Sequence, residues 1–183
     1  LEDALRPVHL RGRLFETLPE GAMLSVSMPA SDLRAMLPAE LSIAADNGPA
    51  LCVAAGPVRA IEALQKTLED REIDSVRVRI SVAAHSSMLE PILAEFGAFF
   101  SRITMNPPAR PFVSNLSGTW ITPAEATDPQ YWVRHLRQTV QFHWLNREPA
   151  GYADFDEFLS SLQRDKRKKI AQERRRVAEA GVQ

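Results

Sequence analysis

The sequence predicts an α/β (α+β) protein whose centre is a β-α-β-β-α-β unit over residues 21–80. Two observations support this prediction. Apolar residues alternate in short segments, as in β-strands, and between these segments apolar residues recur with the 3.6-residue period of a helix. This order of elements is that of the ferredoxin-like, split β-α-β arrangement. Around it the sequence predicts a helix over residues 2–16 and further helices after residue 80.

Four strands and two helices are expected within residues 21–80. The strands are expected at 21–28, 41–45, 51–55 and 75–80, and the helices at 29–37 and from Gly56-Pro57 to Leu68. Residues 46–49 are expected to join the second and third strands as a hairpin, because Asn47-Gly48 favours a tight turn. In the fourth strand the alternation is interpreted as placing Val76, Val78 and Ile80 inward and Arg77 and Arg79 outward.

The flanking segments are predicted to be mainly helical. The helix at 2–16 is expected to start late or to kink at Pro7, because proline lacks the N–H that a helix interior uses. Later elements are expected as a helix from Met88 to about Ile103, a short strand at 111–115, helices that begin at Thr122-Pro123 and Asp128-Pro129, and a basic C-terminal helix within 154–178.

Charged residues are unevenly distributed along the chain. The 22 Lys and Arg nearly balance the 23 Asp and Glu, but eight of the basic residues fall between Arg164 and Arg176. We therefore predict a junction near residue 141 and four regions, at 1–20, 21–80, 81–141 and 142–183. The basic tail lacks the interleaved aromatic residues of a nucleic-acid stacking surface, so a solvated helix face is favoured for it.

Composition excludes several classes of protein. With 183 residues, 45% of them hydrophobic, the chain is long enough for one globular domain. It has no run of about 18 apolar residues that would span a membrane, and residues 1–3 lack the features of a signal peptide, so a cytoplasmic protein is expected. The single Cys52 excludes a disulfide framework. No metal site is expected, because no two of the four histidines are spaced i,i+4; they are His9, His85, His135 and His143.

His85 and Arg11 are the candidates for chemistry. His85 follows a predicted strand, in a run of small residues just before a helix, where active-site groups often lie; a satisfied structural histidine is the alternative. Ser86 and Ser87 are expected to be helix caps rather than nucleophiles, because adjacent residues at the end of a strand point apart. The sequence contains no G-x-S-x-G motif, so it offers His85 no evident serine to activate. Arg11 has apolar neighbours on the first helix and could bind a substrate carboxylate, with a surface arginine as the alternative.

Five stretches resemble the second half of a polyketide synthase acyltransferase domain, of the malonyl-CoA:acyl-carrier-protein transacylase family. They are LEDALRPVHLRGRLFETLPEGAML, ADNGPALCVAAGP, VAAHSSMLEPIL, PFVSNLSGTWIT and ATDPQYWVRHLRQTV, within residues 1 to about 141. The resemblance implies an α/β-hydrolase-like large subdomain with an inserted ferredoxin-like small subdomain. Residues 21–80 would be the small subdomain, and 1–20 and 81–141 would be parts of an incomplete large one.

The resemblance implies transfer of malonyl from CoA to an acyl carrier protein through a serine ester. His85 matches the catalytic histidine, a base toward the serine and then an acid toward the thiolate. Arg11 matches the arginine that binds the malonyl carboxylate, and Asn47 and His135 match polar residues of the pocket. The family's serine lies in a G-H-S-x-G motif that these residues lack, so we expect a fragment that is inactive alone.

The implied partners are an acyl-CoA thioester, the acyl carrier protein and the rest of a polyketide synthase. No cofactor is expected on the chain itself, since phosphopantetheine is carried by the partner. The residues before the histidine track the acyl group in the family, with a bulky Phe for malonyl and a small Ser for methylmalonyl. Val82 and Ala84 match neither pattern; malonyl is favoured, while the small Ala84 leaves room for an α-methyl group.

Residues from about 142 resemble the start of a GNAT-like acyltransferase family of peptidoglycan biosynthesis or recognition, on the stretches FHWLN and GYADFDEFLSSLQRDKRKKIAQERRRVAEAGV. Two other functions stay open. One is a non-catalytic docking module for an acyl carrier protein, which would bind without turnover. The other is binding of phosphate, phospholipid or nucleic acid by the basic tail. In that case the affinity should fall steeply with salt concentration, and binding should remain after residues 1–141 are deleted.

Overall fold

The structure is a computed structural model that describes residues 2–142, residues 155–161 and the single positions 164, 167, 168, 170, 172 and 175. The chain divides into two compact units, residues 1–144 and 145–183. In the second unit the structure describes α7 (Phe155–Ser161); most of the remaining helix predicted at 154–178 lies outside the described residues. No helix among the described residues is long and apolar enough to cross a membrane.

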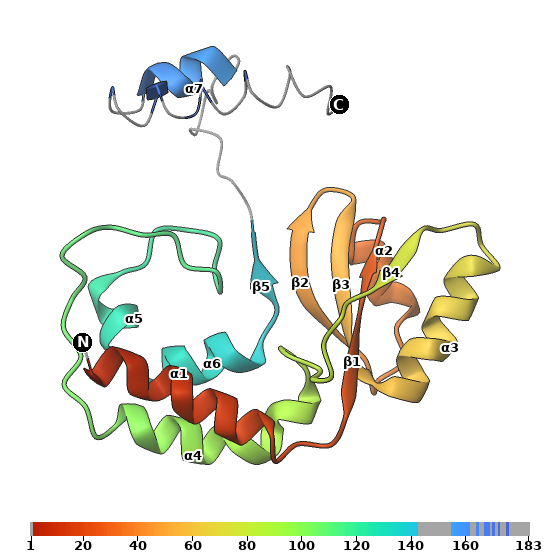
Figure 1. The fold of residues 1–183 in the computed structure, drawn as a ribbon, viewed down its shortest axis with the longest axis horizontal. Coiled ribbons are helices and arrows are strands. Elements are labelled where there is room, and N and C mark those ends of the chain that lie inside the picture. The colour runs from red at the N-terminus through yellow and green to blue at the C-terminus, as the bar shows by residue number, and fades with distance from the viewer. Residues whose placement is uncertain are drawn as a thin grey trace. The chain divides into compact units, whose positions relative to one another are not determined.

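A five-stranded sheet forms the centre of the first unit (Figure 1). Its strands are β1 (Gly21–Val26), β2 (Ser42–Gly48), β3 (Leu51–Pro57), β4 (Ser75–Arg77) and β5 (Val140–Gln141). The order is β4-β1-β3-β2-β5, antiparallel except for the parallel pairing of β2 with β5. The mixed α/β class is therefore confirmed. The fifth strand was not predicted, and it forms where the sequence indicated only a junction.

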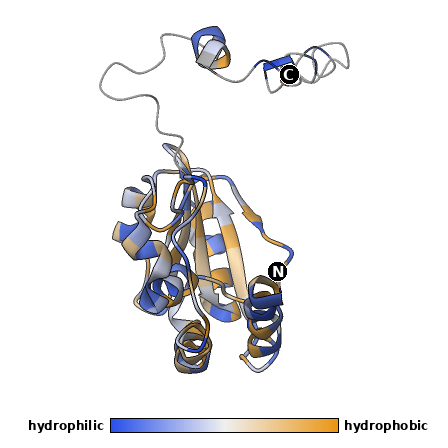
Figure 2. Ribbon diagram, turned by 90° about the vertical axis from the view of Figure 1, so that its left-hand side faces the viewer, coloured by the Kyte–Doolittle hydropathy of each residue, from blue (hydrophilic) through white to orange (hydrophobic). Residues whose placement is uncertain are grey.

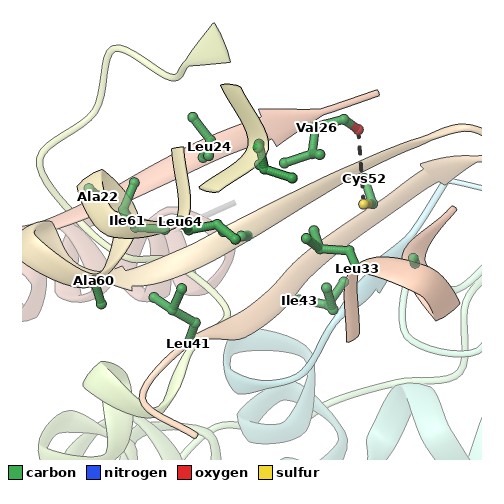
Figure 3. Packing of buried hydrophobic residues seen from close by; sticks show 13 residues of the cluster. Ala22, Leu24, Val26, Leu33, Leu41, Ile43, Cys52, Ala60, Ile61 and Leu64 are labelled. Atoms are coloured by element: carbon green, nitrogen blue, oxygen red, sulfur yellow. Dashed lines mark hydrogen bonds between the residues drawn. The ribbon is translucent and has the colours of Figure 1, made fainter. Parts of the chain in front are cut away.

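Two helices, α2 (Ala30–Met36) and α3 (Val58–Glu69), cover one face of the sheet. Alternate residues of the strands point into this layer and pack against the apolar stripe of α3 (Figure 3). The buried cluster includes Ala22, Leu24, Val26, Ile43, Ile61, Leu64 and Leu68. Each large side chain buried here contributes about 1.5–3 kcal/mol to folding.

Cys52 belongs to this core and is completely buried, with its Sγ 4.0 Å from the Val26 carbonyl oxygen. Burial, and then the nearby negative charge of Asp46, raise the pKa of the Cys52 thiol to about 11. The thiol therefore stays protonated at neutral pH, and Cys52 acts as a small core residue.

The other face of the sheet packs against the segment that leads to α4, and Val140 of the edge strand β5 belongs to the same cluster. This second cluster contains Ala44, Ala45, Val53, Ala55, Ala83 and Val140, with Met23 and Met88 partly buried beside them. In Figure 2 the strands show mostly hydrophobic colours between the more mixed colours of the helices. Apolar residues on both faces explain why the strands are rich in Ala, Val, Leu and Ile.

Helices pack together in the rest of the unit: α1 (Glu2–Phe15), α4 (Glu90–Phe100) and α6 (Pro129–Arg137), with α4 in contact with both others (Figure 1). The 3₁₀ turn Ser87–Leu89 precedes α4, and the short α5 (Pro123–Thr127) precedes α6. Both predicted helix starts are confirmed: Thr122 forms a capping box ahead of α5, and the Asp128 side chain accepts from the Gln130 N–H ahead of α6.

Four local predictions differ from the structure. Helix α1 begins at Glu2 and contains Pro7, so the predicted late start is wrong, while the alternative of a kink at Pro7 stays a prediction. The helix predicted to about Ile103 ends at Phe100. The strand at 111–115 is reduced to a single bridge between Val113 and Trp120. The tight turn between β2 and β3 is Pro49-Ala50, because β2 continues through Asn47-Gly48.

In the fourth strand, the residues that face inward and outward are the reverse of those predicted. Only Ser75–Arg77 pairs, as an edge strand beside β1, with Arg77 opposite Leu24 and Val76 opposite Ser25. Opposed residues share a face of the sheet, so Arg77 lies on the face covered by helices. Val76 lies on the other face and is 69% exposed.

Gly21 joins the sheet to the segment after β4, and its replacement by alanine is expected to destabilise the first unit. Its N–H donates to the Ser81 carbonyl at 2.8 Å, and an added Cβ would lie 2.6 Å from the Ala83 nitrogen. Forcing this contact open costs about 1–3 kcal/mol. Urea unfolding of Gly21→Ala measures the loss.

Gly12→Ala is the matched control for this variant. Gly12 lies in α1 with nothing within 4 Å of an added Cβ, so alanine should stabilise the helix by up to about 1 kcal/mol. Equal unfolding midpoints for the two variants would contradict the close packing at Gly21.

Candidate active site

His85 lies in the turn between the strand β4 and the helix α4, in a backbone conformation that few residues adopt. Its φ is +56°, and Glu72 is the only other described residue besides glycine with a positive φ. Ser86, fully buried, stabilises the turn: its Oγ donates to the Ala83 carbonyl at 2.7 Å and accepts from the Met88 N–H at 3.2 Å. The predicted capping role of Ser86 is thus confirmed. Such strained positions are concentrated at functional sites.

The His85 imidazole faces the C-terminal end of α6. Its Nδ1 is buried, with no hydrogen-bond partner among the described residues. Burial lowers the pKa of His85 below its ordinary 6.5, and the charge of nearby His135 lowers this pKa further; backbone groups of Gln138, His135 and Leu136 oppose both effects. Carbonyls at a helix C-terminus carry negative partial charge, which explains the opposing effect. His85 is therefore mainly neutral at pH 7 and able to accept a proton.

His135 is the second imidazole of the site and lies on α6. Its ring centre is 6.5 Å from that of His85, with the rings nearly perpendicular, and it also contacts the rings of Tyr131 and Trp132. Burial, followed by the positive charge of Arg11, lowers the pKa of His135. Because His135 is then neutral, Arg11 is the cationic group beside it.

One cavity, of about 310 Å³, joins four of the residues that the sequence singled out: Arg11, Ala84, His85 and His135. We call it the Arg11 cavity; its lining residues are Arg11, Phe15, Ala84, His85, Asn115, His135, Leu136, Val140 and Phe142. Arg11 comes from α1 and is exposed, and no carboxylate among the described residues pairs with it. The cavity thus holds a free guanidinium and a half-buried, neutral base.

The structure does not bring all the expected site residues together. Ala84 lines the Arg11 cavity, whereas Val82 packs in the helical cluster around Leu89 and does not line it. Asn47 is exposed near the end of β2 and is not among the lining residues. Its placement near the pocket therefore has no support in the geometry.

Asn115 lines the cavity but was not among the residues singled out in the sequence. The preceding residue, Ser114, is fully buried, and its hydroxyl lies 2.7 Å from the hydroxyl of Tyr131. The Asn115 carbonyl accepts from the Gln141 N–H of β5 at 2.6 Å. The stretch PFVSNLSGTWIT contained the signal, because a polar residue follows a short apolar segment there.

Two further cavities adjoin this site. One, of about 420 Å³, is mostly apolar and shares Arg11, His135 and Leu136 with the Arg11 cavity. The other, of about 450 Å³, shares His85 and is lined mainly by polar residues; we call it the Arg34 cavity. No group of three or more metal-ligating side chains was found among the described residues.

Comparison with known proteins decides the family. The sequence model described as "Acyl transferase domain" matches residues 1–155. The chain belongs to this family. The match extends past the predicted junction near residue 141, so the acyltransferase similarity includes the first part of the tail. Together with the relatives described next, this match shows an acyltransferase domain of the polyketide synthase type.

Polyketide synthases are among its relatives. A phenolphthiocerol/phthiocerol polyketide synthase of Mycobacterium tuberculosis is 38% identical over 142 residues, which are 78% of this chain and 10% of that protein. Spectinabilin polyketide synthase system protein NorB of Streptomyces orinoci is 36% identical over 147 residues, 78% of this chain and 7% of that protein. The chain thus spans a tenth or less of these relatives.

Solved structures share the fold. The acyltransferase domain of SpnD, in complex with 2-(pent-4-yn-1-yl)malonyl, is 39% identical with a TM-score of 0.73, over 76% of this chain and 34% of that one. FabD from Acinetobacter baumannii, at 20% identity and a TM-score of 0.70, shares the fold over 76% of this chain and 48% of its own.

Proposed function

We propose that this acyltransferase chain supplies the base and the carboxylate-binding group for transfer of a malonyl group from CoA to an acyl carrier protein. The observation that carries the proposal is the Arg11 cavity, which joins a neutral imidazole to a guanidinium without a carboxylate partner among the described residues. Arg11 would hold the malonyl carboxylate by paired hydrogen bonds, and His85 would move protons. The polyketide synthase relatives support a synthase as the setting.

Transfer would proceed through a serine ester in two proton-balanced steps. His85 takes the serine proton as the serine oxygen attacks the thioester carbonyl; the C–S bond breaks, and the proton goes to the CoA thiolate. The carrier thiol then gives its proton to His85 and attacks the ester, and the proton returns to the serine oxygen. Because Nδ1 is buried, Nε2 is the nitrogen assigned to these transfers. No cofactor held by this chain takes part.

The 183 residues contain no G-x-S-x-G motif, so we infer that a further polypeptide segment supplies the serine. Ala84 lines the cavity and Val82 does not, which makes Ala84 the residue of this pair to influence the acyl group; malonyl stays favoured. The antiparallel order β4-β1-β3-β2, with α2 and α3 on one face, supports a ferredoxin-like small subdomain within residues 21–80.

Mass spectrometry after incubation with malonyl-CoA tests the proposal. The 183-residue chain alone should show no covalent acyl adduct. A chimera in which residues 1–142 replace the matching part of a related acyltransferase domain, one that carries G-H-S-x-G, should be acylated on that serine and should pass the acyl group to a holo-carrier protein. An adduct on the chain alone would refute the inference that the serine is supplied elsewhere. A folded chimera that binds carrier without acylation would favour a docking module.

A further inference from the structure

His85 lines two cavities that each contain an arginine, the Arg11 cavity and the Arg34 cavity. The proposed reaction uses only the Arg11 cavity. The Arg34 cavity, of about 450 Å³, has lining from α2, β2, the C-terminal end of α6 and the segment after α6. Its lining residues are Arg34, Ser42, Ile43, His85, Leu116, Arg137, Gln138, Thr139 and Gln141. No carboxylate is among them, and most of the others can donate hydrogen bonds.

Arg34 carries the uncompensated charge of this cavity. Arg137 is already paired, with its Nε 2.6 Å from the Glu90 carboxylate, and the Thr139 hydroxyl donates to the Ile43 carbonyl at 2.6 Å. Arg34 is exposed on α2 and has no ion pair with any described residue. Asp46 lines a neighbouring cavity that Arg34 also lines, together with Gly48 and Pro49. Because the Arg34 cavity has no carboxylate in its own lining, we expect an anion to prefer it to that neighbour.

We propose that the Arg34 cavity binds the phosphate of the phosphopantetheine arm that presents the thioester to His85. This inference rests on the proposed function. A malonyl-phosphopantetheine thioester has one anion at each end, a carboxylate and a phosphate, with the reacting carbonyl between them. The cavities are consistent with this order, because His85 lines both and alternate residues of one segment separate them: Val140 lines the Arg11 cavity, whereas Thr139 and Gln141 line the Arg34 cavity. A guanidinium suits a phosphate because its planar N–H groups form paired, charge-assisted hydrogen bonds.

Calorimetric titration of the 183-residue chain with 4′-phosphopantetheine and with pantetheine tests the inference, because the two compounds differ only in the phosphate. We expect 4′-phosphopantetheine to bind about ten- to a hundredfold more tightly, the range for hydrogen bonds to a charged group. Arg34→Gln should abolish this difference, and Arg34→Lys should restore part of it. Arg59→Gln, an exposed change on α3 away from these cavities, should leave it intact.

The outcomes separate this inference from the proposed function. Equal binding of the two compounds to the unchanged chain overturns the phosphate site and leaves the acyltransferase proposal standing. A difference that persists in Arg34→Gln also overturns it. If neither compound binds, binding of the thioester arm by this chain fails, and both proposals fail with it.

CoA and a holo-carrier protein distinguish the two sources of the phosphate. If Arg34 contacts the phosphate of the arm, Arg34→Gln weakens both by a similar factor, because both carry this group. A loss confined to CoA would mean that the nucleotide phosphates are contacted, and it would overturn the assignment to the arm.

Discussion

Replacement of His85 by alanine in the chimera is expected to slow acylation of the serine by about 10²- to 10⁴-fold, the contribution of a positioned general base. His85 is the half-buried base that the Arg11 and Arg34 cavities share. His9→Ala is the matched control, because His9 is exposed on α1 and lines neither cavity. Stopped-flow release of CoA from malonyl-CoA measures the rate. A His85→Ala chimera that acylates at the unchanged rate would remove the imidazole from the mechanism.

The pH profile of the same chimera provides a second measure of this histidine. Burial and the charge of His135 lower the pKa of His85, so it stays unprotonated as the pH falls to below 6.5. The acid limb of the rate profile should therefore lie below pH 6.5. Replacing His135 by glutamine removes a like charge, raises the pKa of His85 and should move that limb upward. An acid limb that moves to lower pH would contradict the electrostatic coupling between His85 and His135.

The two-residue alternation that marks a strand could be predicted from the sequence. Which of the alternating residues lie on which face of the sheet could not. Alternating valines and arginines at 75–80 indicate a strand, yet both phases of the alternation fit the pattern. Pairing with β1 selects the phase, since it places Arg77 opposite Leu24. The same applies to Asn47-Gly48, which favours a hairpin turn locally but lies within β2, where the register with β3 shifts between Asp46 and Gly48. Tertiary pairing decides both features.

The candidate site shows the same limit at longer range. The small residues around His85 indicated a position just before a helix, where active-site groups often lie, but they did not predict its positive φ. Nothing in the spacing of Arg11 and His85 shows that they share a cavity, and only the resemblance suggested it. Asn115 was missed because β5, which fixes its carbonyl, is two residues long and pairs in parallel with a distant strand. Strands this short leave no periodic signal in a sequence.

Replacement of Arg11 by glutamine in the chimera is expected to reduce transfer of malonyl by about ten- to a hundredfold and to leave transfer of acetyl nearly unchanged. Only malonyl carries the carboxylate that the guanidinium would bind, and hydrogen bonds to charged groups contribute about 1.5–3 kcal/mol. Arg13→Gln, two residues further along α1 and exposed, is the control. Competition between malonyl-CoA and acetyl-CoA measures the ratio directly.

The 183-residue chain offers an independent test of the same geometry. The positive charge of Arg11 lowers the pKa of His135, so Arg11→Gln should raise that pKa in an NMR titration of the imidazole, while Arg13→Gln should not. A raised pKa with an unchanged malonyl preference would show that Arg11 lies beside His135 as described but does not bind the acyl carboxylate. An unchanged pKa would contradict the cavity itself, because a guanidinium that faces the ring must repel its proton.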